Sequence, residues 1–333
     1  SRSVKDWAEH LRAYANSDKA NAEAAFWQQQ CNAIDTHLPA LNTQAPLRIA
    51  DARSVSTALD ANTTQRLLKQ CPGAYRTQIN DLLLAALARV LQRWTGRAEH
   101  LVQLEGHGRE ALGEELDLTR SVGWFTSLYP ARVSAGGSIE QAIKQTKEHL
   151  RAIPNKGAGF GALRAYAPTP VRQALAALPV PRITFNYLGQ FASNQADQAS
   201  LFHPMAADKG REQNSEAPLQ NWLALNGQVF ADQLRINWSF SAQMFDEATV
   251  QQLADDYARE LNALIDWCSD TQHRGLTPSD VPLASLTQAQ LDSLPIACDA
   301  IEDIYPLSTT QQGMLFHTQD PSTADFYLNQ TSV

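Results

Sequence analysis

The sequence predicts an α/β fold, because strand-like and helix-like segments alternate along most of the chain. Residues 77–94 are apolar nearly all round, which indicates a helix buried against a sheet. A long amphipathic pattern over 246–267 predicts a second major helix. Short apolar runs between these two segments, bounded by turn residues, are typical of strands.

The N-terminal part is predicted to be mainly helical. Ser3 can cap a first helix, in which Val4, Trp7 and Leu11 recur at helical spacing. The following elements are, in order, a helix at 20–33, a connector at 39–51, a strand at 54–59 and a short helix from Asp60 to Leu68.

From the apolar helix onward, strands and helices alternate. Gly96 ends that helix, and Pro154 stops a later one. The elements are strands at 101–104 and 128–133, helices at 138–151 and 168–178, then strands at 182–187, 222–226, 228–230 and 234–240. The last two strands form a hairpin that turns at Ala231 and Asp232.

Composition excludes several classes of function. The net charge is −8 without a basic block, so nucleic acid is not expected as a partner. The apolar run at 82–88 is far shorter than the ~20 residues that cross a bilayer, so no membrane span is expected. No signal peptide opens the chain, and its four cysteines are widely separated without a metal-like pair. We therefore expect free thiols, no metal site and a cytoplasmic location.

Residues 105–110 (EGHGRE) form the first candidate for chemistry. They follow the strand at 101–104, and Gly106 and Gly108 permit backbone geometry that other residues resist. A turn at a strand end can place the Glu105 carboxylate in a cleft, where desolvation favours general acid/base work. The alternative is a surface turn in which Glu105 and Arg109 pair with each other.

Three further stretches are less specific. Trp124 and Phe125 follow Gly123 and either line a pocket or pack in the core. Residues 157–161 (GAGFG) lack the Lys-Ser/Thr of a phosphate-binding loop and suggest a flexible loop that permits close approach of a ligand or of another lobe. Asn186 and Tyr187 end a strand on opposite faces. The Tyr187 hydroxyl either donates to a developing oxyanion or packs with its hydroxyl at solvent.

The order of these motifs resembles that of epimerisation domains of non-ribosomal peptide synthetases, in the condensation-domain superfamily. The resemblance covers roughly residues 1–270, and the Trp124 motif (VGWFT) favours epimerisation over peptide-bond formation. It implies a chloramphenicol acetyltransferase-like fold, in which two α/β lobes form a V around a tunnel. A carrier protein delivers an aminoacyl or peptidyl thioester on its phosphopantetheine arm, and no directly bound cofactor is implied. The resemblance further implies that the domain removes the α-proton of the terminal L-residue and returns a proton on the other face, which gives an L/D mixture.

The resemblance also implies the roles of individual residues. Glu105 matches the acid/base glutamate, and Asn186 and Tyr187 match positions that line the same site. We expect Glu105 and Tyr187 to be the catalytic residues. The substrate-binding positions are Asn186, His107, Trp124 and Phe125.

One part of the family pattern is absent. None of the eight histidines has a His neighbour, so the His-His-x-x-x-Asp-Gly motif that supplies the second acid/base group does not occur. We expect most of the N-terminal lobe to lie before residue 1, so that this chain is inactive alone and exposes a broad apolar face toward the missing lobe. The expected domains are the end of the N-terminal lobe with connector helices at 1–52, the C-terminal lobe at 53–272, a linker at 273–303 and the beginning of a downstream condensation domain at 304–333.

Two other functions compete with epimerisation. A condensation domain has the same fold but forms peptide bonds, and the Trp124 motif argues against it. A non-catalytic module that only docks carrier proteins would not need the Glu105 carboxylate. The expected partners are an upstream peptidyl carrier protein, the missing lobe and the downstream condensation domain.

Overall fold

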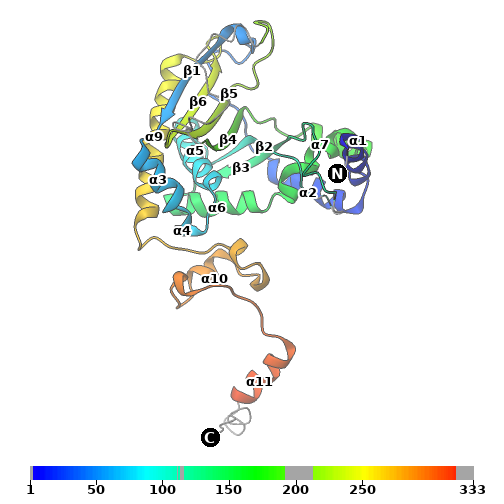
Figure 1. The fold of residues 1–333 in the computed structure, drawn as a ribbon, viewed down its shortest axis with the longest axis vertical. Helices are drawn as coiled ribbons and strands as arrows, with labels where there is room; N and C mark the ends of the chain where they lie inside the picture. Colours follow the sequence, from blue (N-terminus) through cyan, green and yellow to red (C-terminus); the bar gives the residue numbers. More distant parts are fainter. Residues whose placement is uncertain (1–2, 111, 113–115, 192–212, 320–333) are drawn as a thin grey trace, which may run out of the picture. The chain divides into compact units, whose positions relative to one another are not determined.

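The structure is a computed structural model that describes residues 3–110, 112, 116–191 and 213–319. The chain divides into two compact units, Ser1–His273 and Arg274–Val333. The first unit contains a six-stranded mixed sheet and most of the helices, and it holds the candidate site (Figure 1).

The sheet has the strand order β1-β6-β5-β4-β2-β3. Its central neighbours β2, β4 and β5 run parallel, while the other pairs are antiparallel. The strands are β1 (Ala52–Ala58), β2 (Glu99–Gly106), β3 (Ser127–Ser134), β4 (Ile183–Phe191), β5 (Leu223–Phe230) and β6 (Gln233–Ser241). The carboxyl ends of β2 and β4 therefore lie side by side, which is where open α/β sheets commonly place ligand sites.

One face of the sheet is covered by α5 (Ile79–Thr95), α6 (Ile139–Arg151) and α9 (Glu247–Ser269). The apolar residues of α5 that predicted a buried helix are completely buried from Leu82 to Ala88, and Gly96 caps the helix in the left-handed conformation. Side-chain burial alternates along β6, in which Ile236, Trp238 and Phe240 are fully buried. Two shorter helices, α3 (Ala61–Lys69) and α4 (Pro72–Tyr75), pack against α9.

The opposite face of the sheet carries mainly small and polar side chains. Asn186, Asn226 and Asn237 are paired across β4, β5 and β6, and Ser56 of β1 continues the row. Exposed apolar side chains also lie on these strands, namely Leu128 of β3, Leu188 of β4 and Phe230 of β5. The broad apolar surface that we expected toward a missing lobe therefore stays a prediction.

Four helices gather beside the edge strand β3: α1 (Val4–Tyr14), α2 (Asp18–Cys31), α7 (Ala158–Tyr166) and α8 (Thr169–Ala176) (Figure 1). Ser3 caps α1 as predicted, in a reciprocal capping box with Asp6. The buried Glu23 carboxylate accepts hydrogen bonds from Trp27 Nε1 at 3.0 Å, from Asn155 Nδ2 at 3.3 Å and from the Tyr14 hydroxyl. The contacts tie α1 and α2 to the segment before α7.

Most predicted elements are confirmed, with two shifts that matter. The separate strands expected at 222–226 and 228–230 are one strand, β5, and the hairpin to β6 turns at Ala231 and Asp232 with φ of 48° and 61°. β2 continues to Gly106, so Glu105 lies within a strand rather than in the turn after it.

The prediction of a flexible loop at 157–161 is wrong. Residues Pro154–Gly157 form a 3₁₀ turn, and α7 begins at Ala158. Gly157 adopts φ of 81° where a Cβ would lie 2.0 Å from the Tyr129 ring, and a Cβ on Gly159 would lie 2.5 Å from the Glu23 carboxylate. Gly157 and Gly159 therefore serve close packing, because the chain passes too near these neighbours for a side chain at either position.

The second unit contains short helices and its own small core. Between 274 and 304 it has three 3₁₀ turns and α10 (Gln288–Asp292), where the sequence pattern predicted a linker over 273–303. Leu276, Val281, Leu291 and Ile301 form the buried cluster. After it comes α11 (Thr309–Gln319).

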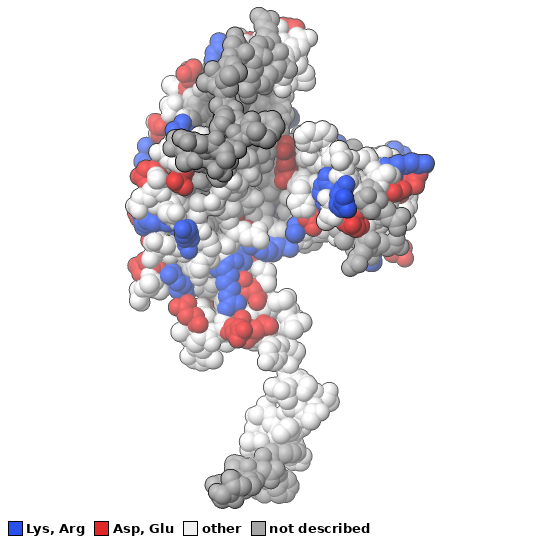
Figure 2. Space-filling view, viewed as in Figure 1, with Lys and Arg blue, Asp and Glu red and all other residues white. Residues whose placement is uncertain are grey.

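The surface carries intermingled acidic and basic side chains on the face shown in Figure 2. Among the residues that the structure describes, no helix has both the length and the apolar character needed to span a bilayer. The same described residues hold no cluster of three His, Cys, Asp or Glu side chains that could bind a metal ion.

Candidate functional site

The site is built where β2 and β4 run side by side. Leu104 of β2 pairs with Phe185 of β4, so the next residues along both strands, Glu105 and Asn186, are neighbours. On the other side of β2, Glu105 faces Leu128 of the edge strand β3. The parallel register thus places the acid/base candidate next to a polar amide, although the two lie 81 residues apart in the chain.

The Glu105 carboxylate accepts hydrogen bonds from two neutral amides. Asn186 donates from Nδ2 to Oε2 at 3.2 Å, and Gln220 donates from Nε2 to Oε1 at 3.2 Å. The surface turn with a Glu105–Arg109 pair is not formed. Instead, Arg109 donates to the backbone carbonyls of Leu118, Ser121 and Gly123, and its guanidinium lies 4.1 Å from the centroid of the Phe125 ring. Among the described residues, the Glu105 carboxylate is thus held by two neutral amides and forms no ion pair.

A cavity of about 540 Å³ opens at this place. It brings together four of the six residues expected in the site: Glu105, His107, Asn186 and Tyr187. The rest of its wall comes from the start of α5, the end of α6, the following turn and the residues around Gly106 and Tyr129. A cavity of this size with convergent polar groups suits a small-molecule substrate or the end of an acyl chain.

Tyr187 lines the cavity and also packs against the main core. Burial raises the pKa of its phenol above the ordinary value, because the phenolate would lose solvation. Tyr187 is therefore a protonated hydroxyl near neutral pH, able to donate a hydrogen bond but poorly suited to act as a base.

His107 lies at the rim in a short polar network. Its Nδ1 accepts the Arg109 backbone N–H at 3.1 Å, and its Nε2 lies 3.0 Å from Glu110 Oε1. Lys156 Nζ lies 3.4 Å from the same Glu110 oxygen. The His107 side chain remains 66% exposed at the edge of the cavity that it lines.

The structure does not bring Trp124 and Phe125 into this cavity. Phe125 is buried against Trp7, with ring centroids 6.4 Å apart, and lines a neighbouring cavity of about 500 Å³. Trp124 is 95% exposed, so it neither packs in the core nor lines the Glu105 cavity. The two neighbours differ in direction next to Gly123, whose φ of 154° is a conformation that other residues rarely adopt.

Three residues at the site, Asp81, Arg151 and Gln220, were not foreseen from the sequence. Asp81 is 1% exposed and receives a two-pronged hydrogen bond from Arg151, at 3.0 and 2.7 Å, and both residues line the cavity. Gln220 precedes β5 and reaches Glu105 across the sheet. The spacing of Gln78 and Asp81 could have suggested a helix cap, but nothing in the sequence indicates the long-range pairings.

Gly108 should be intolerant of any side chain, whereas Gly161 should tolerate one. Gly108 adopts φ of 68° and a Cβ there would lie 1.6 Å from the Phe125 carbonyl oxygen, while Gly161 is exposed in α7 with nothing within 4 Å. We expect Gly108→Ala to lower the free energy of unfolding by about 2 kcal/mol or more. Gly161→Ala should raise it by about 0.5–1 kcal/mol. Urea unfolding of both variants checks this pair, and equal effects would contradict the geometry of the turn.

The fold and site together define a chloramphenicol acetyltransferase-like α/β lobe with a carboxylate at its central strand ends. The sequence model of the "Condensation domain" family matches residues 1–287, and the chain belongs to this family as a domain of the non-ribosomal peptide synthetase type.

Similar proteins include large peptide synthetases. The chain is 39% identical over 99% of its length to a linear gramicidin synthase polypeptide of Brevibacillus parabrevis, and 33% identical over 99% to bacitracin synthase 3 of Bacillus licheniformis. It spans only 6% and 5% of those two proteins. Among solved structures, the epimerization domain from the third module of tyrocidine synthetase B matches with a TM-score of 0.73 and 35% identity, over 80% of this chain and 60% of that one.

Proposed function

We propose that this chain supplies the carboxylate half of an epimerisation site, which converts a carrier-bound aminoacyl or peptidyl thioester from L to D at the α-carbon. The observation that carries the proposal is the Glu105 carboxylate, held by two neutral amides at the wall of the cavity. The 35% identity to an epimerization domain supports the choice of reaction within the family.

The chemistry needs two proton-transfer groups on opposite faces of the α-carbon. The Glu105 carboxylate takes or returns the proton on one face, and the electron pair of the broken C–H bond moves into an enolate of the thioester. A second group on the opposite face delivers a proton to the α-carbon, and the reverse sequence restores the L form. Both steps transfer only protons, so they need no oxidant or reductant. We place the second group in another part of the complete domain, since the His-His-x-x-x-Asp-Gly motif is absent from this sequence.

Other cavity residues fit supporting roles. The Tyr187 hydroxyl stays protonated and can donate to the developing enolate oxygen. Asn186 holds one Glu105 oxygen, and the exposed His107 lies where the thioester arm would enter. The carrier's phosphopantetheine arm brings the substrate, so this chain needs no cofactor of its own in the proposal.

The test is the stereochemistry of the residue on the carrier. The complete domain with its natural preceding sequence is mixed with a carrier loaded with an L-aminoacyl or L-peptidyl thioester, and the hydrolysed residue is separated by chiral chromatography. We expect an L/D mixture from either the L or the D starting thioester. A pure L residue together with amide formation on a second loaded carrier would establish peptide-bond formation instead. A pure L residue with carrier binding alone would leave only a docking role.

A further inference from the structure

A second amide, Gln220, reaches the Glu105 carboxylate from outside the strand that carries Asn186. Its Nε2 donates to Oε1 at 3.2 Å, while Asn186 occupies Oε2 at the same distance. One donor on each oxygen fixes both the position of the carboxylate and its rotation about the last side-chain bond. Gln220 contacts Glu105 from outside the set of residues that line the cavity.

The backbone on both sides of Gln220 is anchored. Leu219 donates its N–H to the Leu47 carbonyl at 3.0 Å. Asn221 donates from Nδ2 to the Pro181 carbonyl and to Thr184 Oγ1, both at 3.1 Å. Because Thr184 lies on β4 two residues before Asn186, the Gln220 backbone is fixed relative to the strand that carries the first amide.

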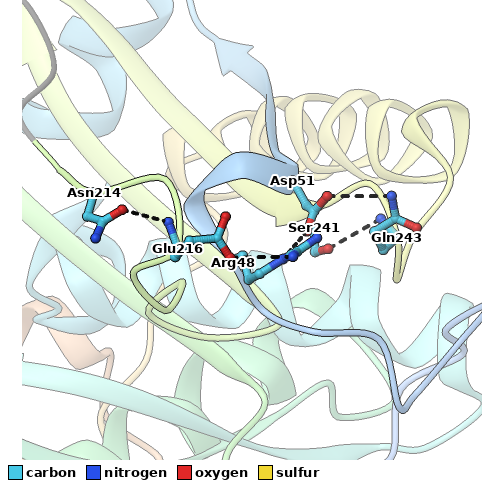
Figure 3. A network of polar contacts seen from close by, with 6 residues as sticks. All are labelled: Arg48, Asp51, Asn214, Glu216, Ser241 and Gln243. Atoms are coloured by element: carbon cyan, nitrogen blue, oxygen red, sulfur yellow. Dashed lines mark hydrogen bonds and ion pairs between the residues drawn. The ribbon is translucent and has the colours of Figure 1, made fainter.

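The preceding residues are held by a polar network (Figure 3). Arg48 lies between two carboxylates, with Nε 2.9 Å from Asp51 Oδ2 and Nη1 3.5 Å from Glu216 Oε2. Backbone hydrogen bonds from Ile49 to Ala217 and from Ala50 to Ser215 run beside these contacts. The exposed ion pairs contribute little energy singly, but together with the backbone bonds they define the course of residues 214–219.

We propose that Gln220 is a positioning residue, which orients the Glu105 carboxylate for proton transfer together with Asn186. The inference rests on the proposed function of Glu105 and extends it to a residue from a separate segment of the chain. A carboxylate with one amide on each oxygen presents its remaining lone pairs in a fixed direction. If the carboxylate is misdirected, the rate constant of proton transfer falls while the affinity for the substrate is unchanged. The two neutral amides orient the Glu105 carboxylate without a cation that would neutralise its negative charge.

The experiment measures loss of α-deuterium from a carrier-bound L-[α-²H]aminoacyl thioester, with the complete domain and its natural preceding sequence. Gln220→Met keeps the length of the side chain and removes the amide. We expect kcat to fall about tenfold, as for one lost hydrogen bond to a charged group, with KM unchanged within about twofold. The matched control is Gln252→Met on α9, which removes another exposed amide donor, 3.2 Å from the Asp256 carboxylate. That control should exchange at the wild-type rate.

A second background separates positioning from a general structural effect. Glu105→Asp shortens the carboxylate and withdraws it from Gln220, so Gln220→Met should change the rate less than about twofold in this background. An equal loss in both backgrounds, or a wild-type rate for Gln220→Met, would refute the positioning role. Absence of exchange by the wild-type domain would instead refute the proposed function itself, so the two failures are distinguishable.

Discussion

Replacing Glu105 with Gln in the complete domain should lower the rate of α-proton exchange by on the order of 10³-fold, the usual range for loss of a general acid/base group. The substitution keeps the shape of the side chain but removes the carboxylate that would accept the proton. Fold and carrier binding should be retained, because Glu105 is only partly buried and has no charged partner among the described residues. The measurement is the release of α-deuterium from the loaded carrier under single-turnover conditions.

A matched control lies on the same strand. Glu99 begins β2, and its Oε1 accepts a hydrogen bond from Arg132 Nε at 2.9 Å, away from the cavity. Glu99→Gln removes the same charge and should exchange at the wild-type rate within about twofold. If Glu105→Gln behaved like Glu99→Gln, the carboxylate would have no part in the reaction, and a docking role would be favoured.

Replacing Asp81 with Ala should lower the free energy of unfolding by about 3 kcal/mol. The Asp81 carboxylate is buried, caps the Gln78 N–H at 2.7 Å at the start of α5 and receives both prongs of the Arg151 guanidinium. Its removal leaves a partly buried guanidinium without its partner and uncaps the central helix. Urea unfolding followed by tryptophan fluorescence measures the loss.

The control for this prediction is the equivalent cap at the start of α1. Asp6 accepts the Ser3 N–H at 2.8 Å in the same reciprocal geometry, but the contact is exposed. Asp6→Ala should lower the free energy of unfolding by about 1 kcal/mol or less. If Asp81→Ala lowered the free energy of unfolding only as much as Asp6→Ala, the buried pair with Arg151 would add nothing to the stability of the fold.

Local sequence patterns predict most of the fold because each depends on a few adjacent residues. The helix at 77–94 follows from its apolar residues and Gly96, and the hairpin follows from the short break between two alternating strands. The prediction of a loop at 157–161 is wrong because Gly157 and Gly159 lie against Tyr129 and Glu23, which are distant in the chain. Glycine permits a loop, but it equally permits a helix to pass close to a neighbour.

The site was predictable only in part, because contacts between residues distant in the chain leave no local sequence pattern. Motif order identifies Glu105 and Asn186, and the pairing of β2 with β4 brings them together. Trp124 belongs to the same ordered motifs, yet its direction depends on the conformation of Gly123 and on Arg109, which binds the surrounding carbonyls. Gln220 carries no local signal, because its partner is reached through a segment anchored to residues 47–50.

The central claim is that Glu105 moves the α-proton of a carrier-bound thioester. The most direct test incubates the complete domain in D₂O with separate L- and D-aminoacyl carriers and follows deuterium at the α-carbon by mass spectrometry. We predict that the wild-type domain incorporates one solvent deuterium from either starting isomer, and that Glu105→Gln incorporates it on the order of 10³-fold more slowly. Full retention of the original α-proton by the wild-type domain, or undiminished incorporation by Glu105→Gln, would contradict the claim.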